Sequence, residues 1–321
     1  MILNILLLIG GLVLILVGAN MLTDGSSDLA RRMGISELVV GLTVVAFGTS
    51  TPELVISLIS AVKGTSELAI GNVVGSNIFN ICGIIGIVAL IKPMKVSHNI
   101  MNNEIPLVFL SSLILLIMGN GPLLDSEPAM ILSRVDGLLL MLFFILFMRH
   151  TLSQAKTGAP AQESADAKPP MNVAKAILFV LLGLAGLIFG GDIFVDGATG
   201  IAKALGVSDA VIALTIVAVG TSLPELAVSI TAAVKGKPEL ALGNVIGSNI
   251  FNIFLVLGAS ATIFPLRFGA IGNVDLLTLL LASALFWIFG RFFRQNTITR
   301  IEGGILAAMY ILYTAWLISN A

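Results

Sequence analysis

The stretch GTSTPELVIS, residues 48–57, places a carboxylate one residue after a proline inside a long apolar run. The same pattern returns as GTSLPELAVS at residues 220–229. A proline in a helix removes one hydrogen bond and frees a carbonyl one turn back. A charge and a helix breaker that occur together twice indicate a functional site, because both supply unpaired oxygen.

Composition predicts that the chain lies in a bilayer. It has 321 residues, of which 57% are hydrophobic and only 11% charged, whereas soluble proteins carry about 25% charged residues. The apolar runs lack the alternation of an outer-membrane barrel, so the fold class is an all-α membrane protein. The net charge of −1 says nothing about nucleic acid, but no basic tract is present, so we expect no nucleic-acid partner; the expected surroundings are membrane lipid. The ten predicted transmembrane helices are residues 2–22, 38–62, 69–91, 104–119, 129–148, 173–195, 208–234, 240–264, 271–290 and 302–319.

The positive charges predict an orientation with both termini outside. In that arrangement thirteen of the 17 Lys and Arg residues fall in inner connections, and the outer connections keep only Lys63, Arg134, Lys203 and Arg267. Short cytoplasmic loops gather Lys and Arg, which favours N-out and C-out. Losing or adding one helix would scramble this asymmetry, so it also supports an even number of helices.

The two motif copies belong to a longer internal repeat. At an offset of 172, residues 36–93 match residues 208–265 at about 34 of 58 positions without a gap. Each half then holds five helices, and an odd number per half inverts the second half relative to the first, as in many secondary transporters. We therefore divide the chain into a first five-helix repeat (1–149), a polar and flexible cytoplasmic linker (150–172) and a second, inverted repeat (173–321).

Both motif glutamates are predicted to lie near the middle of the membrane. Glu53 precedes Lys63, at the far end of its helix, by ten residues, or about 15 Å at 1.5 Å per residue. Glu225 and Lys235 repeat this spacing. A charge at that depth costs about 3 kcal/mol on insertion scales and marks a functional site by default. The alternatives are a structural ion pair or a protonated, hydrogen-bonded glutamate, and neither span carries a Lys or Arg to pair with.

Neutral oxygen atoms surround the two carboxylates in sequence. They belong to Thr49, Ser50, Ser57, Thr221, Ser222 and Ser229 beside the glutamates, and to Asn72, Ser76, Asn80, Asn244, Ser248 and Asn252 at i, i+4, i+8 of the following spans. No His or Cys is near. A set of ligands made only of oxygen suits Ca²⁺ and Na⁺ and argues against zinc or copper. Two negative charges would balance one Ca²⁺.

Other roles stay open for these polar residues. Hydroxyl groups in membrane helices often bond to their own backbone or bridge two helices. Asn77 and Asn249 fall off the face shared by the serines and asparagines, so they are candidates either for helix–helix contact or for indirect ligation. Asn72 and Asn244 lie near the ends of their spans, where they could cap or unwind a helix.

The paired GTS-x-PE and G-N-V-[VI]-G-S-N-I-F-N segments resemble the α-repeats of the sodium/calcium exchanger family, within the calcium/cation antiporter superfamily. The resemblance covers nearly the whole chain, and the short central loop is of the prokaryotic kind. It implies that Glu53 and Glu225 are the central Ca²⁺ and Na⁺ ligands. The further ligands that it implies are Thr49, Ser50, Ser76, Thr221, Ser222 and Ser248, the main-chain oxygens of Ala46 and Ala218, and the pair Asn80 and Asn252. It also implies that the first helix of each half slides to switch access, and it implies no cofactor besides the transported ions.

The predicted function is secondary active exchange of Na⁺ for Ca²⁺ across the cytoplasmic membrane, not an enzymatic reaction. The nearest alternative is H⁺ as the driving ion, because a buried glutamate can carry a proton. Potassium dependence is disfavoured, because some archaeal and potassium-dependent relatives have Asp where this chain has Asn252. A cation channel is less favoured, since channels usually gather symmetric subunits around a pore. An intramembrane hydrolase is disfavoured because no His lies in any span. The sequence predicts no oligomeric state.

Overall fold

The protein is an all-helical membrane protein. The computed structural model describes residues 2–124, 129–157, 171–206, 218–292 and 296–320. The elements before residue 158 are α1 (Ile2–Met33), α2 (Glu37–Val40), η1 (Gly41–Val45), α3 (Ala46–Thr49), α4 (Thr51–Val62), α5 (Ser66–Ile78), η2 (Phe79–Ile85), α6 (Gly86–Ile91), β1 (Met94–Lys95), η3 (Ile100–Glu104), α7 (Ile105–Gly119), α8 (Gly121–Leu124), β2 (Ile131–Leu132) and α9 (Arg134–Thr157). The later elements are α10 (Val173–Ala204), α12 (Ala218–Thr221), α13 (Leu223–Val234), α14 (Pro238–Ile250), η5 (Phe251–Leu257), α15 (Gly258–Ile263), β3 (Leu266–Arg267), α16 (Asn273–Phe292), β4 (Thr297–Ile298) and α17 (Arg300–Asn320), where η marks π-helical turns.

Long apolar helices occupy the predicted membrane spans. In the described part of the chain, eight helices are long and apolar enough to cross a bilayer. The broken pair Glu37–Thr49 and Thr51–Val62, bent by 47°, brings the number to nine when it is counted as one span. These nine correspond to nine of the ten predicted spans. Of the remaining one, 208–234, the structure describes only residues 218–234.

Several helices continue beyond their predicted ends. The helix α1 runs to Met33 and α10 to Ala204, past the apolar segments on which the predictions rested. The helix α9 continues to Thr157, so the first residues of the predicted linker are helical. The greater part of that linker, residues 158–170, lies outside the described residues. Arg31 and Arg32 lie in the last turn of α1, where the helix dipole favours positive charge.

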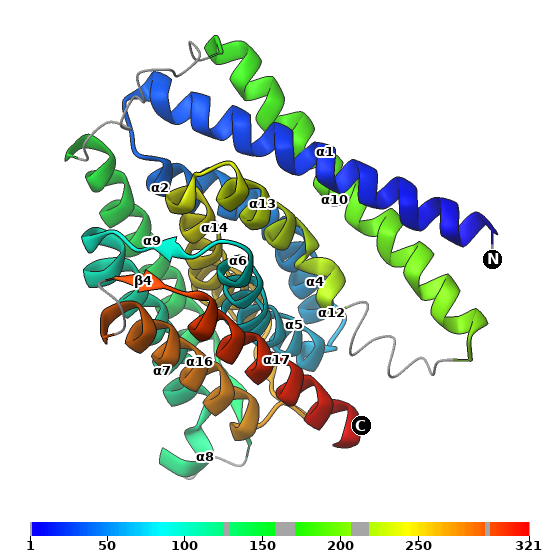
Figure 1. Ribbon diagram of the computed structural model, residues 1–321. Coiled ribbons are helices and arrows are strands. Elements are labelled where there is room, and N and C mark those ends of the chain that lie inside the picture. Colours follow the sequence, from blue (N-terminus) through cyan, green and yellow to red (C-terminus); the bar gives the residue numbers. More distant parts are fainter. Residues whose placement is uncertain (1, 125–128, 158–170, 207–217, 293–295, 321) are drawn as a thin grey trace.

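The helices α1 and α10 form a layer of their own. They lie side by side and cross one face of the remaining bundle (Figure 1). A Cβ atom on Gly18 of α1 would lie 2.8 Å from the main-chain oxygen of Gly183 in α10. A Cβ atom on Gly183 would lie 2.6 Å from the nitrogen of Leu22. Small residues allow membrane helices to approach this closely, so glycines of both halves make this contact.

Two spans form the centre of the bundle. In the most apolar window of the span Pro238–Ile263, 94% of the residues are buried, and in that of Ser66–Ile91 the share is 78%, against 22% for α1. Both central spans carry the G-N-V-[VI]-G-S-N-I-F-N segment. The polar atoms of this segment therefore lie inside the protein, away from lipid.

Two short strand pairs join the halves of the chain. Strand β1 pairs antiparallel with β4, and β2 pairs antiparallel with β3. Met94 lies opposite Ile298, and Ile131 lies opposite Arg267. The sequence analysis predicted no strand, because two residues are too few to show an alternating pattern. Each pair ties a connection of the first half to one of the second.

Candidate cation site

The motif prolines break both helices where the sequence analysis predicted. Pro52 and Pro224 lie in the first turn of α4 and α13, and that position does not need the missing N–H group. The residues before these helices, Ser50 and Ser222, have ψ angles of 7° and 9°, outside the helical region. The glutamate of each motif follows in the first turn, where the helix dipole favours a negative charge.

The two glutamates are each bound by the opposite half. Glu53 and Glu225 have no exposed surface. The hydroxyl of Ser222 donates to Glu53 Oε1 at 3.3 Å, and the hydroxyl of Ser50 donates to Glu225 Oε1 at 3.0 Å. The broken helices therefore meet and share one site.

A serine from the following span completes each set of donors. Ser76 donates to Glu53 Oε1 at 3.3 Å, and Ser248 donates to Glu225 Oε1 at 3.4 Å. Each hydrogen bond to one glutamate has its counterpart at the other, between the residues that the sequence repeat pairs. The local geometry thus repeats the internal sequence repeat.

Two asparagines hold the main chain of the broken helices. Asn72 Nδ2 donates to the carbonyl of Glu53 at 3.4 Å and to the hydroxyl of Ser57 at 3.2 Å. Asn244 makes the equivalent bonds to the second glutamate's carbonyl at 3.3 Å and to Ser229 at 3.1 Å. The sequence analysis placed these asparagines among the neutral oxygens near the glutamates or at helix ends as caps, and it did not predict that they bond the glutamate main chain. The signal for this contact was their spacing, because each asparagine follows its glutamate at the same distance along the sequence.

Buried oxygen atoms of the two glutamates, and of two asparagines in the central spans, have no hydrogen-bond partner. They are Glu53 Oε2, Glu225 Oε2, Asn252 Oδ1 and Asn80 Oδ1. Buried polar atoms in native proteins are nearly always bonded, and no Lys, Arg or His of the described residues pairs with either glutamate. The described residues contain no group of three His, Cys, Asp or Glu side chains that could hold a metal ion, so a cation here would depend on neutral oxygens beside the two carboxylates. The unpartnered oxygens fit a hard cation that would complete their coordination.

The remaining predicted ligands on the broken helices belong to α3 and α12, which directly precede Ser50 and Ser222. Thr49 is buried and donates to Asn244 Oδ1 at 3.1 Å. The carbonyl of Ala46 accepts the N–H of Ser50 at 2.9 Å. Thr221 is half-buried at the end of α12, and Ala218 is the first residue of that helix.

A third buried carboxyl group lies outside the site, and the sequence analysis did not single it out. Glu104 has no exposed surface and sits where η3 passes into α7. Gln154 Nε2 donates to its Oε1 at 3.0 Å, and His150 Nε2 lies 4.0 Å from the same atom. Glu104 therefore has an imidazole beside it, which the two glutamates of the site lack.

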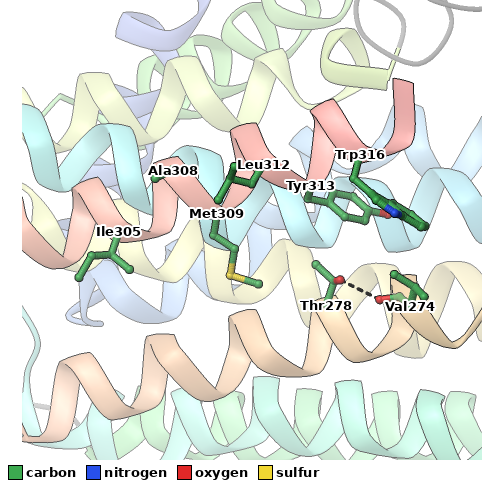
Figure 2. A pocket seen from close by; sticks show the side chains of 8 residues that line it. All are labelled: Val274, Thr278, Ile305, Ala308, Met309, Leu312, Tyr313 and Trp316. Carbon is green, nitrogen blue, oxygen red and sulfur yellow. Dashed lines mark hydrogen bonds between the residues drawn. The ribbon is translucent and has the colours of Figure 1, made fainter. Parts of the chain in front are cut away.

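An open groove on the molecule is a poor candidate for a cation site. It holds about 540 Å³ between α16 and α17, and Figure 2 shows Met309, Leu312 and Trp316 among the side chains that line it. The hydroxyl of Thr278 donates there to the carbonyl of Val274, one turn earlier in the same helix, at 2.7 Å. No charged residue lines the groove. The glutamates, by contrast, are closed off from the surface.

Buried oxygen atoms that repeat in both halves, enclosed by apolar helices, are typical of a membrane protein that binds and transports hard cations. The family model described as sodium/calcium exchanger protein matches residues 3–152 and 175–319. The putative antiporter CaxA of Alkalimonas amylolytica is 38% identical over 97% of each chain, and the sodium/calcium exchanger MaX1 of Methanosarcina acetivorans is 32% identical over 97% of each chain. The solved structure of the sodium-calcium exchanger NCX_Mj superposes with a TM-score of 0.83 at 35% identity and covers 98% of both chains. The chain therefore belongs to the sodium/calcium exchanger family, and it is a multi-pass membrane transporter and not an enzyme.

Proposed function

We propose that this chain is a secondary active antiporter that exchanges Na⁺ for Ca²⁺ across the cytoplasmic membrane by alternating access. The ion ligands in this proposal are Glu53, Glu225, Thr49, Ser50, Ser76, Asn80, Thr221, Ser222, Ser248, Asn252, and the main-chain oxygens of Ala46 and Ala218. We further propose ten membrane-spanning helices in two inverted halves, 1–149 and 173–321, with both termini outside and the connection between the halves in the cytoplasm.

The observation that carries this proposal is the pair of buried carboxyl groups, each with one unpartnered oxygen. Two ionised carboxylates carry a charge of −2, which one Ca²⁺ neutralises. Ca²⁺ takes six to eight oxygen ligands, and the surrounding hydroxyl, amide and carbonyl groups supply the neutral ones. Na⁺ uses the same oxygens. The two ions therefore exclude each other, and this exclusion is the physical basis of exchange.

Hydrogen bonds that cross between the halves support the proposed alternating access. Ser50 of the first half bonds the second glutamate, and Ser222 of the second half bonds the first. A site at the interface of two inverted repeats is reached from either side by equivalent movements of the two halves. This is the structural requirement for alternating access.

A proton-driven exchange is the second candidate. The unpartnered Oε2 atoms of Glu53 and Glu225 would accept protons in place of a cation. In that case, H⁺ and Ca²⁺ would compete for the same two groups. The two amides of Asn80 and Asn252 do not titrate, so all proton binding in the site would fall on the glutamates.

The test is uptake of radiolabelled Ca²⁺ into proteoliposomes loaded with Na⁺, with K⁺ or with an acidic buffer, each diluted into choline medium. We expect uptake from the Na⁺-loaded vesicles only. Glu53→Gln and Glu225→Gln should each reduce it at least about 30-fold, since breaking a buried charge contact costs about 2–5 kcal/mol. Glu104→Gln is the matched control, because it removes a buried carboxyl outside the site.

Each alternative predicts a different pattern. Uptake that requires the acidic interior would replace Na⁺ by H⁺ as the driving ion. Flux that continues without any countergradient and does not saturate would indicate a channel. Normal uptake by the two Gln variants would overturn the assignment of the site itself.

A further inference from the structure

Asn77 is a buried asparagine next to the cation site that touches neither glutamate. It has no exposed surface and lies near the end of α5. Its Nδ2 donates to the main-chain carbonyl of Asn249 at 3.2 Å, and its Oδ1 accepts from Asn252 Nδ2 at 3.0 Å. Asn77 thus connects a backbone group of the second half to one of the proposed ligands.

These contacts fix the direction of each amide in turn. A main-chain carbonyl only accepts hydrogen bonds, so Asn77 must present its Nδ2 to Asn249 and its Oδ1 to Asn252. An oxygen only accepts, so Asn252 must present its own Nδ2 to Asn77. The Oδ1 of Asn252 is thereby turned away from Asn77, and no group of the described protein bonds it.

The equivalent asparagines of the sequence repeat do not make these contacts. Asn249, which corresponds to Asn77 in the sequence repeat, donates its Nδ2 at 2.7 Å to Val245 of its own helix. Asn80, which corresponds to Asn252, has no hydrogen-bond partner for either amide atom. One ligand amide is held in place, and the other has no contact that fixes its direction.

We propose that Asn77 is a positioning residue that holds the side-chain oxygen of Asn252 toward the transported cation. The inference rests on the proposed function, and it makes the two halves unequal. Asn252 offers the ion an oxygen that is already oriented, whereas Asn80 must be oriented by the ion itself. Preorganisation of a ligand strengthens binding by removing the cost of ordering it.

The test is a double-mutant cycle measured by Na⁺-driven Ca²⁺ uptake. Asn77→Ala should raise the half-saturating Ca²⁺ concentration about 5- to 20-fold, because a buried hydrogen bond is lost and the ligand amide is released. The same substitution in an Asn252→Ala background should change that concentration less than about 2-fold, since the residue on which it acts is gone. Asn77→Ser, which cannot bond both partners, should behave like Asn77→Ala.

The controls separate positioning from general packing. Ser112→Ala removes a buried bond between helices away from the site, where Ser112 and Ser283 lie 2.9 Å apart. We expect it to leave the half-saturating concentration unchanged. Thermal unfolding in detergent shows which variants remain folded. If Asn77→Ala has the same effect with and without Asn252, Asn77 is helix–helix packing and the proposal fails. If the unmodified protein shows no Na⁺-driven uptake, it is the proposed function that fails instead.

Discussion

Asn72 and Asn244 hold the carbonyls of the two glutamates that begin the broken helices. Each asparagine donates to a main-chain oxygen and to a serine hydroxyl one turn further on. We predict that Asn72→Ala and Asn244→Ala each lower the free energy of unfolding by about 1–3 kcal/mol, because buried acceptors are left unsatisfied. Thermal unfolding in detergent checks this.

A second measurement separates this role from direct ligation. Because the two asparagines position the glutamate main chain, Ca²⁺ at a high concentration should recover much of the lost stability. Binding to the folded state alone stabilises it by mass action. Stabilities equal to that of the unmodified protein in the absence of Ca²⁺ would contradict the role assigned to both residues.

The central residues of the site were predictable from the sequence, and their supports were not. Glu53 and Glu225 stand out because an apolar span tolerates a charge only for a reason. Asn77 gave no such signal, since an amide off the polar face of a membrane helix has many uses. Its partner lies 175 positions away. Which side chains meet at that separation depends on the angle at which the helices cross, and the sequence of a single helix does not determine this crossing angle.

At the scale of the helices, the contact between α1 and α10 depends on glycine. A Cβ atom on Gly18 would lie 2.8 Å from Gly183 O and from Leu187 N, which are backbone atoms without freedom to move aside. We predict that Gly18→Ala costs about 1–3 kcal/mol through overpacking and slows Ca²⁺ uptake. The half-saturating Ca²⁺ concentration should stay constant, because the ligands are untouched. Thermal unfolding and initial uptake rates at several Ca²⁺ concentrations check both parts.

Gly10 provides the control on the same helix. A Cβ atom there would have nothing within 4 Å. Gly10→Ala should be neutral or stabilising, since alanine favours a helix by about 0.5–1 kcal/mol over glycine. Equal effects of the two substitutions would show that the loss of a flexible glycine matters, and not the close approach of two backbones.

The π-helical segments mark the limit of prediction at this scale. The segments η2 and η5 occupy residues 79–85 and 251–257, which correspond to each other in the sequence repeat, and they contain Asn80 and Asn252. Such turns occur frequently at functional sites. The long apolar runs located the spans, but they cannot separate a π-helical turn from an α-helical one over so short a segment. The ends of α1, α9 and α10 were also missed, because charged residues there no longer match an apolar pattern.

At the scale of the whole molecule, an ion pair joins α1 to the turn between α13 and α14, and among the described residues the equivalent residues of the other half form no such pair. Asp24, on α1, lies 2.8 Å from Lys235 and 3.6 Å from Lys237, beside the turn between α13 and α14. In the sequence repeat, Asp24 corresponds to Asp196 of α10, and Lys235 corresponds to Lys63. Among the described residues, neither Asp196 nor Lys63 takes part in an ion pair.

Because the halves are inverted in the proposed topology, these two ion pairs lie on opposite sides of the membrane. Alternating access exchanges the conformations of the two halves, so the pair between Asp196 and Lys63 should form when that of Asp24 opens. An exposed ion pair contributes about 0.2–1 kcal/mol. We predict that Asp24→Asn shifts the balance of the two states by up to about 5-fold and that Asp196→Asn shifts it in the opposite direction. Both effects should weaken as salt is raised, because Asp24 is 42% exposed.

Crosslinking in proteoliposomes measures this balance directly. The chain has a single cysteine, Cys82, so Cys82→Ala provides a background for a cysteine pair at positions 24 and 235 or at positions 196 and 63. A short, cleavable thiol crosslinker should join either pair and stop Ca²⁺ uptake until it is cleaved. A protein with all four cysteines should form one crosslink or the other in each molecule, because the two ion pairs belong to different states. Molecules that carry both crosslinks, or uptake that continues with positions 24 and 235 joined, would show that the two ion pairs do not alternate.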